Sequence, residues 1–201
     1  MPRKVDPEQQ ERQKAAIAEA VWRLAARAGL ESVSLREVAN EAGVSMGRVQ
    51  HYFRTKDEML LYGLRLALHR MDTRIEKRLA ASTLVGHEDI LRAALAELFG
   101  DDEDTLQAIR VSIAYLGRAL DDAEIAQLLF EDDVQLRELT ADAVRVAQAE
   151  HRTPARLDPE REAHVLWSLA NSLTIEVACG QTAAPDARAI MDYHLERTFG
   201  R

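Results

Sequence analysis

The amino-acid sequence predicts an all-α fold, for three reasons. Apolar residues recur at intervals of three and four, as they do along the buried face of a helix. Residues that favour helix starts and stops punctuate the chain, whereas the apolar–polar alternation typical of strands is nearly absent. Hydrophobic residues make up 47% of the 201 residues and charged residues 30%, which is typical of a soluble chain with a packed core.

Three helices are expected at the N-terminal end. The first begins at Asp6-Pro7, because Asp6 suits the N-cap and Pro7 the first helical position, and it ends near Gly29. The second covers residues 34–42 and the third residues 45–53. Each of these two begins with a serine that suits an N-cap.

These three helices form the first predicted domain, residues 1–55, and a helical bundle of about six helices forms the second, residues 56–201. Thr55 and Glu58 make a capping box that opens a long helix. The helices expected after it are residues 88–99, 103–119, 122–151, 159–179 and 185–198.

Charge is divided unevenly along the chain. Residues 1–57 contain 10 Lys and Arg against 8 Asp and Glu, whereas residues 58–201 contain 16 against 26. The formal net charge of the whole chain is −8, so a mildly basic N-terminal part is joined to an acidic body. This division suggests that the two parts have different functions, and that the acidic body is a poor partner for DNA.

A tight turn at residues 42–45, with the sequence AGVS, joins two helices that are too short to be stable alone. Gly43 permits a left-handed turn, and Val44 and Val49 can fill the angle between the helices. This pattern predicts a helix-turn-helix, whose second helix enters the DNA major groove.

The second helix of that pair has the residue types that reading a groove requires. Arg48 can pair with guanine and Gln50 with adenine, each through two hydrogen bonds. Met46 and Gly47 complete a face that is small where it presses on a duplex and polar where it meets base edges.

The run from residue 34 to residue 60, SLREVANEAGVSMGRVQHYFRTKDEML, is similar to the DNA-binding segment of TetR-family transcriptional regulators. The features that carry the likeness are Ala39, Ala42-Gly43-Val44-Ser45, Gly47, Tyr52-Phe53, Lys56 and Leu60. Many members of the family have an aromatic residue at the position of Gln50, so the likeness implies DNA binding without implying an operator sequence.

The resemblance implies a role for ten residues in contact with double-stranded DNA. Arg36 approaches from the second helix, Met46, Gly47, Arg48 and Gln50 face the bases, and Ser34, Ser45, His51, Tyr52 and Lys56 contact phosphates. The role of Lys56 also has a physical reason apart from the resemblance, because a helix N-terminus already favours an anion. Arg3 and Lys4 are expected to add looser contacts. The alternatives are a core position for Tyr52 and Phe53, and a plain surface position for Arg48, His51 and Lys56.

The resemblance also implies a homodimer, a palindromic operator and a small-molecule effector bound in the body. The expected dimer interface is formed by the last two helices, 159–179 and 185–198. Its candidate residues are Ala163, Leu166, Ala170, Leu173 and Val177. A stripe of this kind can instead pack within its own chain.

The candidates for the effector pocket are Phe99, Arg110, Tyr115, Phe130, Trp167 and Glu176. Arg110 interrupts an apolar face, so it either pairs with a buried anion such as Glu176 or extends to the surface. For the aromatic candidates, the alternative is packing in the core. By the resemblance, effector binding tilts the long helix that begins at Lys56 and releases DNA, as in a repressor.

Other functions have less support. The six histidines form no HxxxH or HExxH pair, and the sequence has no phosphate-binding glycine loop and no G-x-S-x-G elbow. We therefore expect neither an enzyme nor a cofactor or metal site.

The single Cys179, the absence of an export signal and the absence of a long apolar run suggest a cytoplasmic protein outside the membrane. The alternative function is a helical protein-interaction module without DNA, which would respond little to salt, whereas DNA binding would weaken steeply.

Overall fold

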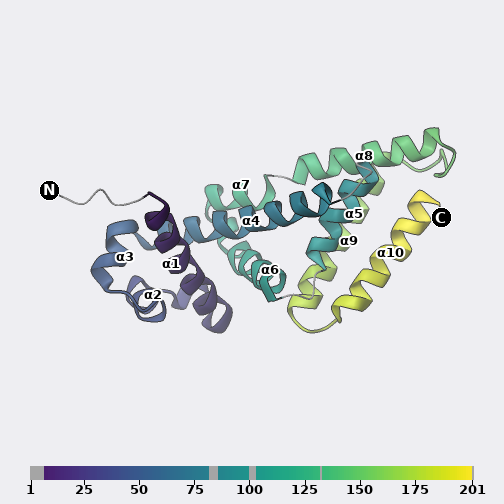
Figure 1. The fold of residues 1–201 in the computed structure, drawn as a ribbon. Helices are drawn as coiled ribbons and strands as arrows, with labels where there is room; N and C mark the ends of the chain where they lie inside the picture. Colours follow the sequence, from purple (N-terminus) through teal and green to yellow (C-terminus); the bar gives the residue numbers. More distant parts are fainter. Residues whose placement is uncertain (1–6, 82–85, 100–102, 132, 201) are drawn as a thin grey trace. The chain divides into compact units, whose positions relative to one another are not determined.

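The computed structural model describes residues 7–81, 86–99, 103–131 and 133–200, and Figure 1 shows their fold. Within these ranges the chain is helical and contains no strand, as the sequence predicts. The chain divides into two compact units. The N-terminal unit consists of Met1–Arg70 and Arg110–Leu128, and the C-terminal unit of Met71–Ile109 and Leu129–Arg201.

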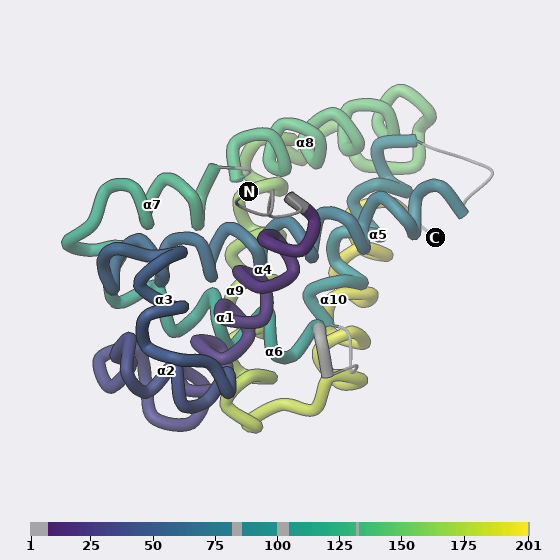
Figure 2. Tube along the Cα trace, turned by 60° about the vertical axis from the view of Figure 1, so that its left-hand side comes forward, coloured from purple at the N-terminus to yellow at the C-terminus, as the bar shows by residue number. Residues whose placement is uncertain are grey.

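The N-terminal unit begins with α1 (Pro7–Ala28), the 3-10 turn η1 (Leu30–Ser32), α2 (Leu35–Glu41) and α3 (Met46–Tyr52), which Figure 2 shows as one group. It continues through the first part of α4 (Lys56–Ala80). A later segment completes it, made of the end of α6 (Glu103–Leu116), the turn η2 (Arg118–Leu120) and most of α7 (Ala123–Phe130).

The C-terminal unit contains α5 (His87–Leu98), α8 (Asp133–Ala149), α9 (Pro159–Ala178) and α10 (Ala184–Phe199), together with the end of α4 and the start of α6. Helices α8 and α9 pack against each other, and α10 lies beside α9 (Figure 1). The core of this unit includes Leu91, Phe99, Leu166, Trp167 and Met191.

Most of the predicted helix starts are confirmed. The Ser34 side chain accepts a hydrogen bond from Glu37 N at 3.2 Å, and the Ser45 side chain accepts one from Arg48 N at 3.2 Å. Thr55 Oγ1 accepts one from Glu58 N at 3.1 Å. These side chains bind backbone N–H groups that have no partner inside the helix. Helix α1 begins at Pro7 as predicted, and its predicted cap Asp6 lies outside the described residues.

Two aromatic side chains reach the backbone of α4 in the core of the N-terminal unit. Trp22 Nε1 donates to Gly63 O at 3.0 Å, and Tyr115 Oη donates to Leu60 O at 2.6 Å. A β-carbon at Gly63 would lie 3.4 Å from both Trp22 Nε1 and Tyr115 Oη, which is close van der Waals contact. Burial raises the pKa of the Tyr115 phenol above its ordinary value, so the group stays a neutral donor.

A fully buried carboxylate lies in the C-terminal unit. Glu97 is 0% exposed, and it accepts hydrogen bonds from Arg74 and from Thr105 Oγ1, the latter at 3.0 Å. Arg78 Nε lies 3.5 Å from Glu97 Oε2. A buried charge needs such partners, because an unpaired one costs several kcal/mol. Glu97 therefore fastens the end of α4 to α5.

The structure differs from the sequence prediction in one place. The single helix expected over residues 122–151 is two helices, α7 and α8. Asp133 begins α8, where a carboxylate in the first turn is favoured by the helix dipole. The N-terminal unit extends along α4 to Arg70, and α4 buries Met59, Leu60 and Leu64 in it.

Among the described residues, no helix is long and apolar enough to cross a membrane.

We expect Glu97→Ala to lower the free energy of unfolding by about 3 kcal/mol, the lower end of the range for breaking a buried ion pair, because Arg78 is half exposed. The measurement is urea unfolding followed by circular dichroism. Glu124→Ala is the control, because it breaks an exposed ion pair with Arg65 and should cost no more than about 1 kcal/mol. Equal losses in the two variants would contradict the structural role of Glu97.

Candidate nucleic-acid interface and regulatory sites

The turn between α2 and α3 depends on Gly43. Its φ is 65°, in the left-handed region that glycine adopts at little cost. Gly43 N donates to Asn40 O at 3.2 Å, and Val44 N donates to Ala39 O at 3.0 Å, which satisfies the carbonyls at the end of α2. Val49 of α3 is fully buried, so the second helix is fixed against the rest of the unit. This is the geometry of a helix-turn-helix.

One face of α3 is exposed. The side chains of Met46, Arg48, Gln50 and His51 are exposed, and so is the backbone at Gly47. A β-carbon at Gly47 would meet nothing within 4 Å, so the backbone there is open to close approach by a partner. The four predicted base-facing residues therefore lie together on the surface of one short helix.

The predicted phosphate-contacting residues surround this face. Ser45 and His51 are exposed, and Ser34, Tyr52 and Lys56 are partly exposed. Arg36 of α2 is exposed as well. The His51 and Tyr52 rings meet edge to face with centroids 5.1 Å apart. Phe53, in contrast, is 2% exposed, in agreement with its alternative interpretation as a core residue. Arg3 and Lys4 lie outside the described residues.

Two of the predicted DNA-binding cations are held by uncharged groups of the same chain. Arg48 Nη1 donates to Gln13 Oε1 of α1 at 2.9 Å. Lys56 Nζ donates to the backbone oxygen of Glu31 at 3.2 Å. Because the acceptors are neutral, both side chains keep their net positive charge. Gln13 is a residue that the sequence interpretation did not identify, since it lies 35 positions from Arg48 and no local motif links them.

Helices α1 and α2 are joined by a partly exposed carboxylate. Glu41 accepts hydrogen bonds from Arg23 Nε at 2.8 Å and from Arg27 Nη2 at 3.1 Å. The hydrogen bonds from Arg23 and Arg27 lower the pKa of the Glu41 carboxyl below its ordinary value. The contact therefore persists as an ion pair at neutral pH and holds the first helix of the turn to α1.

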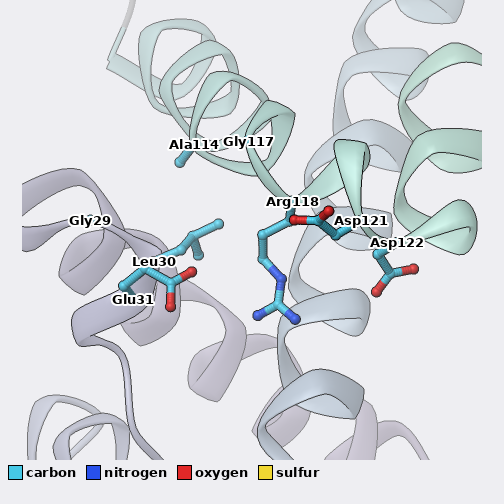
Figure 3. A pocket seen from close by; sticks show the side chains of 8 residues that line it. All are labelled: Gly29, Leu30, Glu31, Ala114, Gly117, Arg118, Asp121 and Asp122. Carbon is cyan, nitrogen blue, oxygen red and sulfur yellow. The ribbon is translucent and has the colours of Figure 1, made fainter.

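The N-terminal unit also contains an open hollow of about 510 Å³, shown in Figure 3. One wall is formed by the turn after α1, and the other by the end of α6, the turn η2 and the two residues before α7. Its lining residues are Gly29, Leu30, Glu31, Ala114, Gly117, Arg118, Asp121 and Asp122. Arg118 extends from this lining to Asp57 of α4, with an N–O distance of 2.8 Å. No candidate for the effector pocket lines this hollow.

The effector-pocket candidates are divided between the two units. Phe99 and Trp167 lie in the core of the C-terminal unit, and Phe130 is exposed there. Tyr115 is buried in the N-terminal unit, as described above, and Arg110 of that unit is exposed.

Glu176, in the C-terminal unit, is partly exposed. It accepts a hydrogen bond from Thr182 Oγ1 at 2.7 Å. It is therefore engaged at the end of α9, near the turn into α10.

The predicted interface stripe on α9 packs within its own chain. Ala163, Leu166, Ala170 and Leu173 are each at most 3% exposed, and Val177 packs against the same core. A different set of apolar residues, on α9 and α10, is exposed. These residues are Val165, Ile175, Ile190 and Tyr193, with Tyr193 62% exposed. Their signal in the sequence is weak, because small and polar residues separate them.

Two family models match the chain. Residues 17–62 match the model of bacterial regulatory proteins of the tetR family, and residues 87–200 match the model of the C-terminal part of BetI-type transcriptional repressors. The HTH-type transcriptional regulator PksA of Bacillus subtilis is 28% identical over 200 aligned positions, which cover 88% of this chain and 95% of PksA. The HTH-type transcriptional regulator BetI of Yersinia pestis is 26% identical over 112 positions, which cover 56% of this chain and 57% of BetI.

Solved structures share the fold. A transcriptional regulator from Rhodococcus sp. Rha1 has a TM-score of 0.75 at 24% identity, covering 92% of this chain and 95% of that chain. A transcriptional regulator from Saccharomonospora viridis in complex with choline has a TM-score of 0.75 at 20% identity, covering 92% and 96%.

We expect Gly43→Val to lower the free energy of unfolding by about 1–2 kcal/mol, because a side chain in the left-handed region strains the backbone. Since a β-carbon would meet nothing within 4 Å, the loss comes from backbone strain and not from a clash. Gly43→Asn should lose less, because asparagine tolerates this region. The measurement is urea unfolding, and a loss as large for asparagine as for valine would contradict this explanation.

Proposed function

Because this chain belongs to the TetR family of bacterial regulatory proteins, we propose that it is a homodimeric transcriptional repressor that binds an inverted-repeat operator and leaves it when a small molecule binds. It is a DNA-binding regulator with a helix-turn-helix, and not an enzyme. The observation that carries the proposal is the exposed face of α3, where Arg48 and Gln50 stand beside the open backbone of Gly47.

In this proposal, Met46, Gly47, Arg48 and Gln50 meet base edges in the major groove. Arg48 offers two parallel donors to a guanine, and Gln50 offers a donor and an acceptor to an adenine. Ser34, Arg36, Ser45, His51, Tyr52 and Lys56 hold the backbone of the duplex. Phosphate contacts of this kind set the position of the protein, whereas the base contacts set its sequence preference.

Helices α9 and α10 supply the proposed dimer interface through their exposed apolar residues. Val165 and Ile175 of α9 and Ile190 and Tyr193 of α10 offer apolar surface that a second copy would cover. An aromatic residue exposed on a helix face is a frequent anchor of such interfaces. A dimer with two-fold symmetry matches the symmetry of an inverted repeat. Its half-sites would be separated by one turn of DNA, which is about 34–36 Å.

The proposed release of DNA uses α4. This helix belongs to the N-terminal unit up to Arg70 and to the C-terminal unit from Met71. A small molecule that binds in the C-terminal unit and favours a different placement of α4 would shift the population away from the DNA-binding arrangement. The choline complex of the Saccharomonospora viridis protein supports the general idea of a small-molecule effector.

The test of specific DNA binding is selection of duplexes from a random pool by the purified protein. We expect an inverted repeat to be enriched, and Arg48→Ala to lose or alter the preference at symmetric positions, because one bidentate base contact contributes about 1–3 kcal/mol of discrimination. Arg156→Ala is the matched control, because it removes an exposed arginine from the C-terminal unit. Binding should weaken steeply as salt is raised.

Failure to enrich any sequence at low salt would contradict the proposal. An enriched sequence that Arg48→Ala leaves unchanged would contradict the assignment of the base-reading face.

The interface is tested by Tyr193→Asp, measured by sedimentation velocity over a range of concentrations. We expect the dimer dissociation constant to rise about thirtyfold or more, because loss of a buried aromatic anchor costs about 2 kcal/mol and a buried unpaired charge adds to this. Val134→Asp, which changes an exposed apolar residue of α8, is the control. A variant at Tyr193 that dimerises as well as the control would place the interface elsewhere.

A further inference from the structure

Arg48 is linked to α1 by the hydrogen bond that it donates to Gln13. In the proposed function this arginine reads a base, so its orientation decides whether it can pair with one. The contact joins the recognition helix to a residue 35 positions earlier. Figures 1 and 2 both show α3 beside α1.

Gln13 stands on a part of α1 that is itself held in place. Tyr62 of α4 donates to Glu11 Oε1 at 2.5 Å, and Lys14 Nζ lies 5.7 Å from the centre of the Tyr62 ring. Ile17, one turn further along α1, is 1% exposed. The Gln13 side chain therefore projects from a helix fixed against α4, and it can hold the long side chain of Arg48 in one orientation.

The chemistry of the Gln13–Arg48 pair is suited to orienting the arginine side chain and not to neutralising its charge. An arginine side chain loses about 2 kcal/mol of rotamer freedom when it is fixed, and fixing it before binding removes part of that cost from the complex. The Gln13 amide oxygen is uncharged and occupies one of five guanidinium N–H donors, so Arg48 keeps its charge and free donors for a base. A carboxylate at this position would instead compete with the DNA for the same cation.

The geometry points to Gln13 as a positioning residue that orients Arg48 for base reading, and so to a determinant of sequence preference that lies outside the recognition helix. This inference rests on the proposed function, because it requires Arg48 to read a base. It predicts that Gln13 affects the discrimination between base pairs more than it affects the general attraction to DNA.

The experiment measures binding by fluorescence anisotropy to the selected duplex, to duplexes altered at the base pair whose preference Arg48→Ala changes, and to an unrelated duplex. We expect Gln13→Ala to reduce discrimination at that base pair about threefold to tenfold, the effect of one net hydrogen bond. Binding to the unrelated duplex should change less than about twofold, because phosphate contacts are retained. In an Arg48→Ala background, Gln13→Ala should have no further effect on discrimination.

Two further variants sharpen the test. Gln9→Ala removes an exposed amide one helical turn earlier on the same face of α1 and should leave discrimination unchanged. Gln13→Glu retains an acceptor oxygen for Arg48, but its carboxylate competes with the DNA for that cation, so binding to every duplex should weaken.

The inference is overturned if Gln13→Ala leaves discrimination intact, if it has the same effect with and without Arg48, or if it strengthens binding by freeing a sequestered cation. Thermal unfolding of each variant detects a general loss of structure, which would lower binding to all duplexes alike. Failure of the proposed function is a separate result, because it is seen when the unaltered protein selects no sequence at all.

Discussion

The N-terminal unit depends on how closely two aromatic side chains approach the backbone of α4. The indole N–H of Trp22 and the phenol of Tyr115 are buried, and each needs an acceptor. Both find one in a carbonyl of α4, at Gly63 and Leu60. These contacts fix α1 and the end of α6 against the same stretch of helix. Because α2 packs on α1 and α3 packs on α2, the direction of α3 is set from inside the core.

The charged groups of the chain are used in two different ways. In the C-terminal unit, the buried Glu97 pairs with Arg74 and Arg78, so that charge holds helices together. On the recognition side, Arg48 and Lys56 bond to an amide oxygen and a backbone carbonyl, which orient them without cancelling their charge. A chain with net charge −8 can therefore still offer a local cationic surface to a polyanion.

The sequence was informative wherever structure is decided locally. Ser34 and Ser45 cap their helices, and Gly43 makes the turn, because caps and left-handed turns depend on one or two residues. Prediction was weaker where distant contacts decide, as for the break within residues 122–151, the burial of the α9 stripe and the pairing of Gln13 with Arg48. Periodicity shows that α9 has a buried face, but it does not distinguish the core of one chain from an interface between two.

The segment from Arg110 to Leu128 belongs to the same compact unit as the helix-turn-helix, although residues 71–109 of the other unit separate it from Arg70 in the sequence. It contributes Tyr115 to the core, and it adds the ion pairs of Arg118 with Asp57 and of Glu124 with Arg65. We therefore expect a fragment that ends at Arg70 to lose the contacts made by Tyr115, Arg118 and Glu124. A chimaera that exchanges only the first 70 residues with a relative would set one protein's α6 against another protein's α4, and its core would have to be matched at Gly63 and Tyr115 together.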